Sequence, residues 1–213
     1  MKQYFNCLAA ILFTCFAATS AIAQTSSDVY GGTSDITWLG MDFTQVKFVG
    51  TATQFKDAGE ISNSDFRDKY IPAWNQLFVN EPKKYNVAEA TRRTEVKYAV
   101  DVTDKVNSKI KKDFFSTGSE EYRTLNESKV ADLVKNYDFD GKTGIGLIFF
   151  IDGMSKGKDE VSGWPTFVNM KTKKVILTSN QTGKPGGFGF RNFWAKGFLE
   201  ILKDVKADFK KNK

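Results

Sequence analysis

The 213-residue sequence has no histidine and only two cysteines, Cys7 and Cys15. Both cysteines lie in a segment that has the features of a secretory signal peptide: a charged start, an apolar stretch, and small residues at Ala21 and Ala23. Once that segment is removed, the chain has neither thiol nor imidazole groups. This excludes disulfides, thiol catalysis, Ser-His and Cys-His dyads, and zinc sites built on Cys or His.

We predict that the signal peptide covers residues 1–23, with cleavage after Ala23. A transmembrane anchor is not favoured, because the apolar stretch falls short of the roughly 20 residues that a span needs. A lipoprotein signal is not favoured either, because Phe13 and Thr14 before Cys15 are too large for that motif. The protein is therefore expected to be periplasmic or secreted.

Acidic residues are slightly fewer than basic ones, 25 against 31, which gives a net charge of +6. Loss of Lys2 with the signal peptide lowers this value to about +5. A net charge of this size keeps a domain soluble and favours binding to anionic surfaces of the cell envelope. It is too small to indicate a nucleic-acid-binding domain. We expect no nucleic-acid partner, no transmembrane span, and a macromolecule of the envelope as a possible partner.

Removal of residues 1–23 leaves 190 of the 213 residues, a length that suits one domain with a sizeable core. Residues 24–35 are rich in Ser, Thr and Gly and predict a flexible leader. No internal repeat, low-complexity tract or interdomain linker interrupts the rest. We therefore predict a single α/β domain over residues 36–213.

The first part of this domain shows strand and helix patterns in turn. Apolar residues alternate over residues 38–49 and slip by one position near residues 44–45, which predicts a strand with a bulge there. Ser62 and Asp65 have the spacing of a capping box and predict a helix start. Pro72 lies inside the helical pattern, so a kink or a restart is expected at that point.

The middle of the chain has weaker patterns. Alternation over residues 96–100 predicts a half-buried strand, whereas residues 104–115 fit either a helix or a loop. Thr124 and Glu127 have capping-box spacing and predict the start of a short helix.

Residues 145–151 are apolar without alternation, which is typical of a strand covered on both faces, and we expect this strand to be central. A loop is predicted over residues 152–160. Before the strand, Asp140 and Gly141 resemble part of a calcium loop, but position twelve of that motif would be Leu147 instead of a carboxylate. We therefore interpret this dipeptide as a tight turn.

The last third of the chain predicts a hairpin followed by a long helix. Pro165 cannot donate a ladder hydrogen bond, so it is expected at the beginning of its strand or on a sheet edge. The next strand is predicted over residues 175–178, and apolar residues at steps of three or four from Phe190 to Phe209 predict an amphipathic helix of about six turns. The predicted fold class is thus α/β (α+β), with a single mixed sheet of about five strands, helices packed on it, and a long C-terminal amphipathic helix.

The hairpin residues form the pattern Trp164-x-x-Phe167-Val168-Asn169-x-x-Thr172-x-Lys174-Val175. With the Gly-rich loop and helix that follow, this pattern resembles small α/β domains of Gram-negative periplasmic and envelope-assembly proteins, such as the curli-assembly lipoprotein and the lipoprotein activators of peptidoglycan synthases. It is also similar to uncharacterised exported α/β proteins of Gram-negative bacteria. The resemblance implies a role in the cell envelope and carries over no functional residue.

The Gly-rich loop, residues 183–191, is the candidate binding site. Four glycines precede a helix N-terminus, where free amides and the helix dipole favour a phosphate, a carboxylate or an acidic glycan. We predict Lys184, Phe188 and Arg191 as ligand-binding residues. The alternative is structural: the glycines permit a tight passage into the helix, and Phe188 and Phe190 fill the core.

Acid-base catalysis would have to use carboxylates, because the chain has no imidazole. The candidates in predicted loops are Asp138, Asp140, Asp152, Asp159 and Glu160. A glycosidase needs two carboxyl groups about 5–9.5 Å apart, a spacing that sequence does not show, so we assign no catalytic residue, no metal and no cofactor. The expected function is a non-enzymatic periplasmic or secreted binding protein that assists the envelope. The alternatives are a carboxylate-based glycan hydrolase and a purely structural role.

Overall fold

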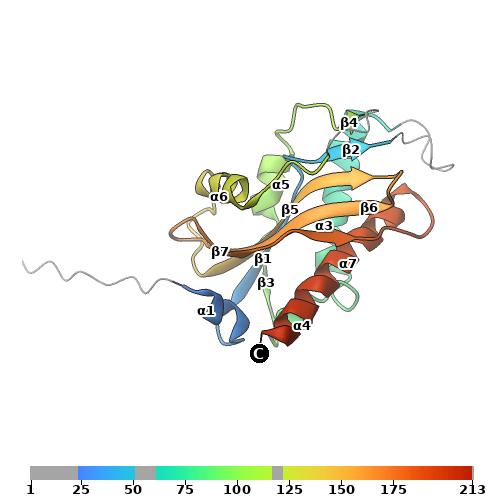
Figure 1. Ribbon diagram of the computed structural model, residues 1–213. Helices are drawn as coiled ribbons and strands as arrows, with labels where there is room; N and C mark the ends of the chain where they lie inside the picture. The colour runs from blue at the N-terminus through green and yellow to red at the C-terminus, as the bar shows by residue number, and fades with distance from the viewer. Residues whose placement is uncertain (1–23, 51–60, 117–121, 213) are drawn as a thin grey trace, which may run out of the picture.

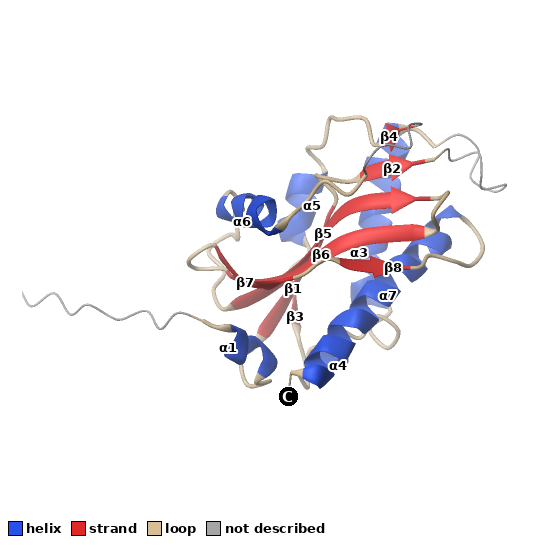
Figure 2. Ribbon diagram, in the orientation of Figure 1, coloured by secondary structure: helices blue, strands red, loops and turns tan. Residues whose placement is uncertain are grey.

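The computed structural model describes residues 24–50, 61–116 and 122–212. They form a mixed α/β fold in which one eight-stranded sheet carries helices on both faces (Figure 1, Figure 2). The predicted fold class is therefore confirmed. The predicted signal peptide, residues 1–23, lies outside the described residues.

Most of the elements are short, and three are long enough to dominate the fold. The strands are β1 (Ile36–Asp42), β2 (Lys47–Val49), β3 (Lys97–Tyr98), β4 (Phe115–Ser116), β5 (Ile145–Ser155), β6 (Glu160–Asn169), β7 (Lys174–Thr178) and β8 (Gln181–Gly183). The helices are α1 (Ser26–Tyr30), α2 (Asn63–Asp65), the π-helical η2 (Phe66–Tyr70), α3 (Ile71–Asn80), α4 (Val87–Ala90), α5 (Asp101–Asn107), α6 (Glu127–Lys135) and α7 (Phe190–Lys211). The long elements β5, β6 and α7 form the frame to which the others attach.

The eight strands occupy five positions across the sheet. Strand β5 is central, as predicted: β1 and then β2 pair with one of its edges in parallel, and β6 pairs with the other edge antiparallel. Outside them, β3 and β4 continue the parallel side, and β7 and β8 both pair with β6. Three of the five positions are thus divided between two short strands. The sequence analysis predicts β1 and β2 as one strand and does not predict β4 and β8, which is why it expects about five strands.

The predicted bulge near residues 44–45 is a larger interruption of the strand. The chain leaves β5 after Asp42, makes a turn in which the Val46 N–H donates to the Phe43 carbonyl at 3.1 Å, and pairs with β5 again from Lys47. The slip in alternation therefore marks the boundary between two strands that follow each other along the same edge.

The prediction for Pro165 is confirmed only in part: the residue lies inside β6 and not at its beginning, but at a point where β6 has no neighbour on its outer side. Strand β7 pairs with β6 from Thr166 onward, and β8 pairs with it only as far as Gly163. Pro165 therefore lies opposite the gap between β7 and β8. A residue without an N–H is tolerated there, because no strand on that side requires its hydrogen bond.

The helix predicted from Ser62 is confirmed, with its capping box and its restart. The Ser62 hydroxyl accepts a hydrogen bond from the Asp65 N–H at 3.0 Å, and the Asp65 carboxylate accepts one from the Ser62 N–H at 3.1 Å. The π-helical turn η2 comes next, and α3 then begins with Pro72 in its first turn. Proline at that point costs no intrahelical bond, because the first N–H groups of a helix have no partner.

Several boundaries differ from the predictions in the middle of the chain. The strand expected over residues 96–100 is reduced to Lys97–Tyr98, and α5 begins at Asp101. Helix α6 begins after Asn126, whose side chain accepts the Lys129 N–H at 2.9 Å, so Thr124 is not its cap. Asparagine and threonine are both good caps, and sequence spacing alone did not separate them.

Two predictions around β5 have opposite outcomes. The tight turn at Asp140 and Gly141 is confirmed: both residues have positive φ, and the Lys142 N–H donates to the Phe139 carbonyl at 3.0 Å. The loop predicted over residues 152–160 is wrong, because β5 continues to Ser155 and β6 begins at Glu160. The hairpin turn is therefore much shorter than expected.

Each face of the sheet has its own hydrophobic core. Helices α3, α4 and α7 cover the larger core, where Trp74, Trp194 and Phe198 are fully buried. Helix α6 and part of α5 cover the smaller core, which includes Val130 and Val134. The predicted C-terminal amphipathic helix is confirmed, and each of its fully buried large side chains stabilises the fold by about 1.5–3 kcal/mol.

The segment expected to be a leader has local structure. Helix α1 lies beside the end of α7, and its Val29 is completely buried (Figure 1). The Arg93 guanidinium donates to the carbonyls of Ser34 at 2.9 Å and Val29 at 2.8 Å, and it lies over the Phe209 ring. This one side chain joins the N-terminal segment to the C-terminal helix.

Candidate functional site

The predicted binding loop, residues 183–191, connects β8 to α7 and is anchored at both ends. Gly183 is buried against the backbone of Gly197 in α7. Inside the loop, the Gly186 N–H donates to the Phe193 carbonyl at 2.9 Å, and the Arg191 carbonyl accepts the Trp74 Nε1–H at 2.9 Å. These bonds define the conformation of the loop without using its charged side chains.

Gly187 and Gly189 supply the backbone conformation that the loop needs. Their φ angles are +104° and +82°, in the region where a side chain is strained. The glycines therefore serve the turn into α7, as the structural interpretation predicts. That conformation also places the two phenylalanines of the loop in different surroundings.

Phe188 is 84% exposed, whereas Phe190 is 2% exposed and packs against Phe48 and Tyr70. The structural interpretation had both rings filling the core, and for Phe188 it is wrong. A signal in the sequence separates them, because only Phe190 belongs to the apolar stripe of the helix. Single exposed hydrophobic side chains are common on protein surfaces, so the exposure of Phe188 becomes informative only together with the charged residues of the same loop.

The charged residues of the loop and of the first turns of α7 are all basic. Residues 183–199 contain Lys184, Arg191 and Lys196 and no acidic residue, and all three are exposed. A side chain at Gly186 would lie 3.3 Å from the Lys196 Nζ, so this ammonium group is beside the loop. The loop thus presents an aromatic ring together with several positive charges.

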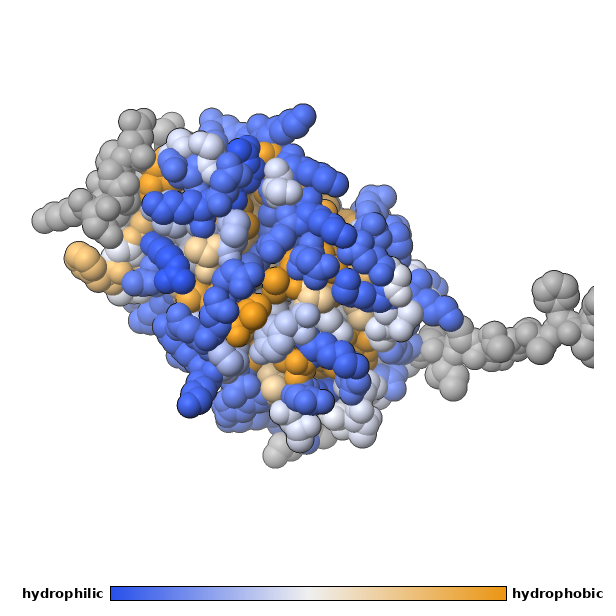
Figure 3. All heavy atoms as spheres, turned by 180° about the vertical axis from the view of Figure 1, so that it is seen from behind, coloured by the Kyte–Doolittle hydropathy of each residue, from blue (hydrophilic) through white to orange (hydrophobic). Residues whose placement is uncertain are grey.

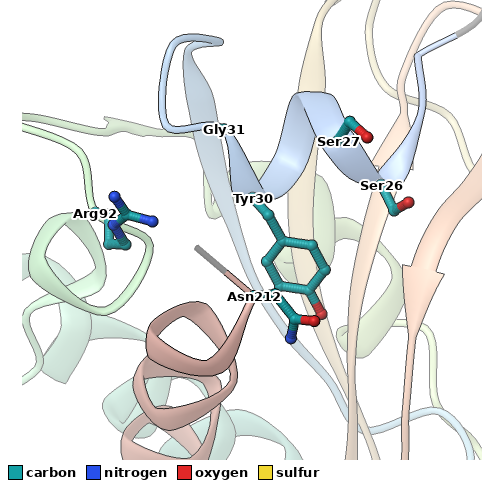
Figure 4. Close-up of a pocket in the computed structure, with 6 residues that line it drawn as sticks. All are labelled: Ser26, Ser27, Tyr30, Gly31, Arg92 and Asn212. Atoms are coloured by element: carbon teal, nitrogen blue, oxygen red, sulfur yellow. The ribbon is translucent and has the colours of Figure 1, made fainter.

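Four pockets formed by the described residues lie elsewhere. The one in Figure 4 has a volume of about 450 Å³ and is lined by Ser26, Ser27, Tyr30, Gly31, Arg92 and Asn212. The others measure about 500 Å³ between α6 and β7, about 170 Å³ between α4 and α7, and about 20 Å³ beside Phe167. None of these four is lined by the predicted ligand-binding residues, so the loop site is a projecting surface instead of one of these hollows.

The pocket in Figure 4 does not gather its polar groups around one point. The Arg92 guanidinium lies on one side of Tyr30, and the hydroxyls of Ser26 and Ser27 lie on the other. Figure 3 shows that the rear face of the molecule is mostly hydrophilic, with hydrophobic side chains visible between the polar ones. These views do not provide a second site with converging groups.

The structure also contains a buried polar cluster that the sequence did not indicate. Asp42, at the end of β1, is 2% exposed, and its carboxylate accepts hydrogen bonds from the Tyr137 hydroxyl at 2.6 Å and the Thr44 N–H at 2.6 Å. Burial raises the pKa of Asp42, although these bonds oppose the shift. Partial desolvation lowers the pKa of Lys112 to about 8, and the attraction of Asp42 opposes this shift.

Ligands of open α/β sheets commonly bind at the carboxyl ends of parallel strands, which is where Asp42 lies. Here the backbone at that end is bonded to side chains of the protein itself. Asn75 accepts the Met41 N–H at 2.7 Å, and Asn107 accepts the Phe43 N–H at 2.9 Å and donates to the Met41 carbonyl at 2.8 Å. The cluster therefore closes the end of β1 and stabilises the sheet.

The carboxylates considered for catalysis are engaged by other groups of the protein. Asp140 pairs with Lys105, Asp159 pairs with Lys156, and Glu160 pairs with Arg123. Asp138 accepts the Asp140 N–H at 3.0 Å within the tight turn. None of these acids lines the four pockets described above.

Asp152, predicted in a loop, is instead completely buried in β5. Its Oδ2 accepts the Leu125 N–H at 3.1 Å and the Trp164 Nε1–H at 3.4 Å, whereas its Oδ1 has no partner among the described residues. A substrate does not reach a carboxylate enclosed in this way. We interpret Asp152 as a group that joins the segment before α6 to the sheet.

Comparison with protein-family models, with curated protein sequences and with solved structures found no match to this chain. Within the described ranges, no helix is both long and apolar enough to span a bilayer.

Proposed function

We propose that this protein is a non-enzymatic binding protein of the periplasm or of the extracellular space, which attaches to an anionic lipid surface of the cell envelope through residues 183–191. The observation that carries the proposal is Phe188, 84% exposed at the tip of a loop whose only charged residues are basic. In this proposal Phe188 inserts among the lipids, while Lys184 and Arg191 contact the anionic headgroups.

The expected free energy of this attachment is the sum of the contributions of the phenylalanine and of the basic residues. Burial of a phenylalanine side chain contributes about 1.5–3 kcal/mol. Each lysine or arginine close to an anionic leaflet contributes about 1 kcal/mol. Phe188 with Lys184, Arg191 and Lys196 therefore gives about 4.5–6 kcal/mol, a dissociation constant in the range of about 0.04–0.5 mM. Such binding is weak and reversible, and it weakens as salt concentration rises.

The predicted export of the protein agrees with binding to an envelope surface. Export is itself part of the proposal. The predicted signal peptide, residues 1–23, would deliver the chain to a compartment that contains anionic envelope surfaces. The resemblance to exported α/β proteins of Gram-negative bacteria agrees with that route. The carboxylates, by contrast, are ion-paired, bonded within a turn, or buried, so their arrangement gives no support to the glycan hydrolase alternative.

Cosedimentation with lipid vesicles tests the proposal. The wild-type protein is expected to bind vesicles of phosphatidylcholine with phosphatidylglycerol, and not vesicles of phosphatidylcholine alone. Phe188→Ser and the double variant Lys184→Gln/Arg191→Gln are expected to lose most of this binding. Tyr98→Ser is the matched control, because Tyr98 is also an exposed aromatic residue, at 39%, but lies in β3.

Two results would contradict the proposal. One is binding that Phe188→Ser leaves unchanged. The other is retention on the acidic polysaccharide alginate without binding to anionic vesicles, which would point to a glycan instead of a lipid surface. Release of reducing ends from alginate or peptidoglycan by the wild-type protein would revive the hydrolase alternative.

A further inference from the structure

A second surface of the protein has an independent excess of positive charge. The groove of about 500 Å³ between α6 and β7 is lined by Ala131, Lys135, Thr172, Lys173, Lys174 and Val175. Three of these six residues are lysines, and none is acidic. Ala131 and Val175 give the groove an apolar part between the charges.

The lysines of the hairpin are available for a partner. Lys135 pairs with Asp132 at 2.9 Å, but Lys173 and Lys174 form no ion pair with any residue in the described part of the chain. Both are exposed, and Lys173 has a φ of +55° at the turn between β6 and β7. Both lysines thus line the groove without an ion pair to any carboxylate of the described residues.

The hairpin that carries these lysines is well defined. The Lys173 N–H donates to the Asn169 carbonyl at 2.8 Å, and the Thr172 N–H donates to the Asn169 side-chain oxygen at 2.8 Å. Both the backbone and the side chain of Asn169 therefore hold the turn through hydrogen bonds. A rigid surface loses less entropy on binding than a flexible one.

The shape of the groove favours a segment of a larger partner over a small molecule. Small-molecule sites bury most of the ligand surface, whereas this groove is open along the side of the hairpin. A second copy of this hairpin does not fit either, because residues 171–178 contain three lysines and no acid. Charge complementarity therefore calls for a partner that carries carboxylates.

We propose that the groove between α6 and β7 binds an acidic peptide segment of a partner protein, with glutamate or aspartate side chains on Lys173 and Lys174 and an apolar side chain on Ala131 and Val175. Lys135 adds a third positive charge at the helix side of the groove. Residues of this kind steer an acidic partner by long-range attraction and fix its register on docking.

The groove and the loop site lie at opposite ends of the sheet (Figure 1). Lys174 pairs with Asn169 at one end of β6, and Gly183 pairs with Val161 near the other. Eight residues of strand separate these positions, which is about 26 Å at roughly 3.3 Å per residue. Where the proposed lipid attachment also holds, the protein joins an acidic partner to an anionic surface.

Fluorescence anisotropy in solution tests the groove without any vesicle. The probe is a labelled peptide of glutamates with interspersed valines, and the same peptide with lysine in place of glutamate is the charge control. The wild-type protein is expected to bind only the acidic probe. Lys173→Glu/Lys174→Glu is expected to weaken binding about tenfold or more, because it replaces attraction with repulsion.

Lys171→Glu is the matched control, since Lys171 is exposed on the same hairpin but does not line the groove. It is expected to change the affinity by less than about threefold. Failure of the wild-type protein to bind the acidic probe, or equal weakening by Lys171→Glu, would overturn the proposal. Displacement of the probe by inorganic phosphate at low millimolar concentration would overturn it too, since it would identify a small-anion site.

The two proposals fail separately. Phe188→Ser is expected to keep full affinity for the acidic peptide, and Lys173→Glu/Lys174→Glu is expected to keep binding to anionic vesicles. Circular dichroism of each variant confirms that the comparison is between folded proteins. Loss of both activities in either variant would show that the two surfaces are not independent.

Discussion

Gly183 and Gly197 meet backbone to backbone where the loop site joins α7. A Cβ atom added to Gly183 would lie 1.9 Å from the Gly197 carbonyl oxygen, and one added to Gly197 would lie 2.6 Å from the Val161 side chain. Contacts under 3.0 Å force atoms to move, and here the first obstacle is backbone. Glycine at position 183 is what lets β8 approach the helix.

We therefore predict that Gly183→Ala lowers the free energy of unfolding by about 1–3 kcal/mol, as overpacking of a close contact does. Gly157→Ala is the control, because an added Cβ there meets nothing within 4 Å. Chemical denaturation of the two variants measures the difference. Equal stability of both variants would show that α7 shifts without cost.

Asn107 supplies the hydrogen bonds that a neighbouring strand would otherwise provide to the end of β1. Its side chain bonds the Phe43 N–H and the Met41 carbonyl, and it is 2% exposed. Asn107→Ala leaves the buried Phe43 N–H without this partner, whereas the Met41 carbonyl still accepts the Asn75 Nδ2–H at 3.3 Å. We predict a loss of about 1–3 kcal/mol in the free energy of unfolding.

Asn136→Ala is a suitable comparison for this variant. Asn136 is exposed and its side chain donates only to the Asp132 carbonyl at 3.0 Å. A loss well below 1 kcal/mol is expected there, since solvent replaces the missing donor. Similar losses in both variants would mean that water satisfies the end of β1 after the change.

The Asp42 carboxyl gives the fold a pH dependence of a definite sign. Its pKa is raised in the folded state by burial, so the folded protein binds more protons than the unfolded chain above the ordinary pKa of 3.8. The contribution of this group to stability is therefore largest at low pH and declines as pH rises through the raised pKa. Other carboxyls oppose this trend, because the pKa values of Asp65 and Asp140 are lowered.

Asp42→Asn isolates the effect of the one group. The variant keeps a side-chain oxygen for the Tyr137 hydroxyl but no longer titrates. We predict that its stability relative to the wild-type protein improves as pH rises from about 4 to about 7. Urea denaturation at several pH values measures this difference, and a difference that stays constant across the range would contradict the prediction.

Elements defined by local periodicity were predicted well from sequence. The stripe from Phe190 to Phe209 lies within one helix, and the apolar run that begins at Ile145 lies within one strand, so neither depends on distant parts of the chain. The position of Pro165 was predicted only in part, for the opposite reason. Its surroundings depend on how β7 and β8 divide the edge of β6, which no local pattern encodes.

The same distinction applies to the candidate sites. The loop with Lys184, Phe188 and Arg191 was found because its residues are adjacent in sequence, although its projecting shape was not foreseen. The bond between Tyr137 and Asp42 joins residues 95 positions apart, and a single aspartate at a strand end has many structural roles. The groove between α6 and β7 likewise required the packing of two elements that are distant in the chain.

Arg93 offers a sharp test of how the N-terminal segment is held. Its guanidinium bonds the carbonyls of Val29 and Ser34 and lies over Phe209, while the adjacent Arg92 is exposed. Arg93→Ala removes charge-assisted bonds of about 1.5–3 kcal/mol each, and much of this loss falls on local attachment of α1. We predict faster chymotrypsin cleavage after Tyr30, the last residue of α1, and a modestly lower melting temperature. Arg92→Ala, which removes the neighbouring exposed arginine, is expected to leave both unchanged. If the two variants are cleaved at the same rate, α1 is held by burial of Val29 alone.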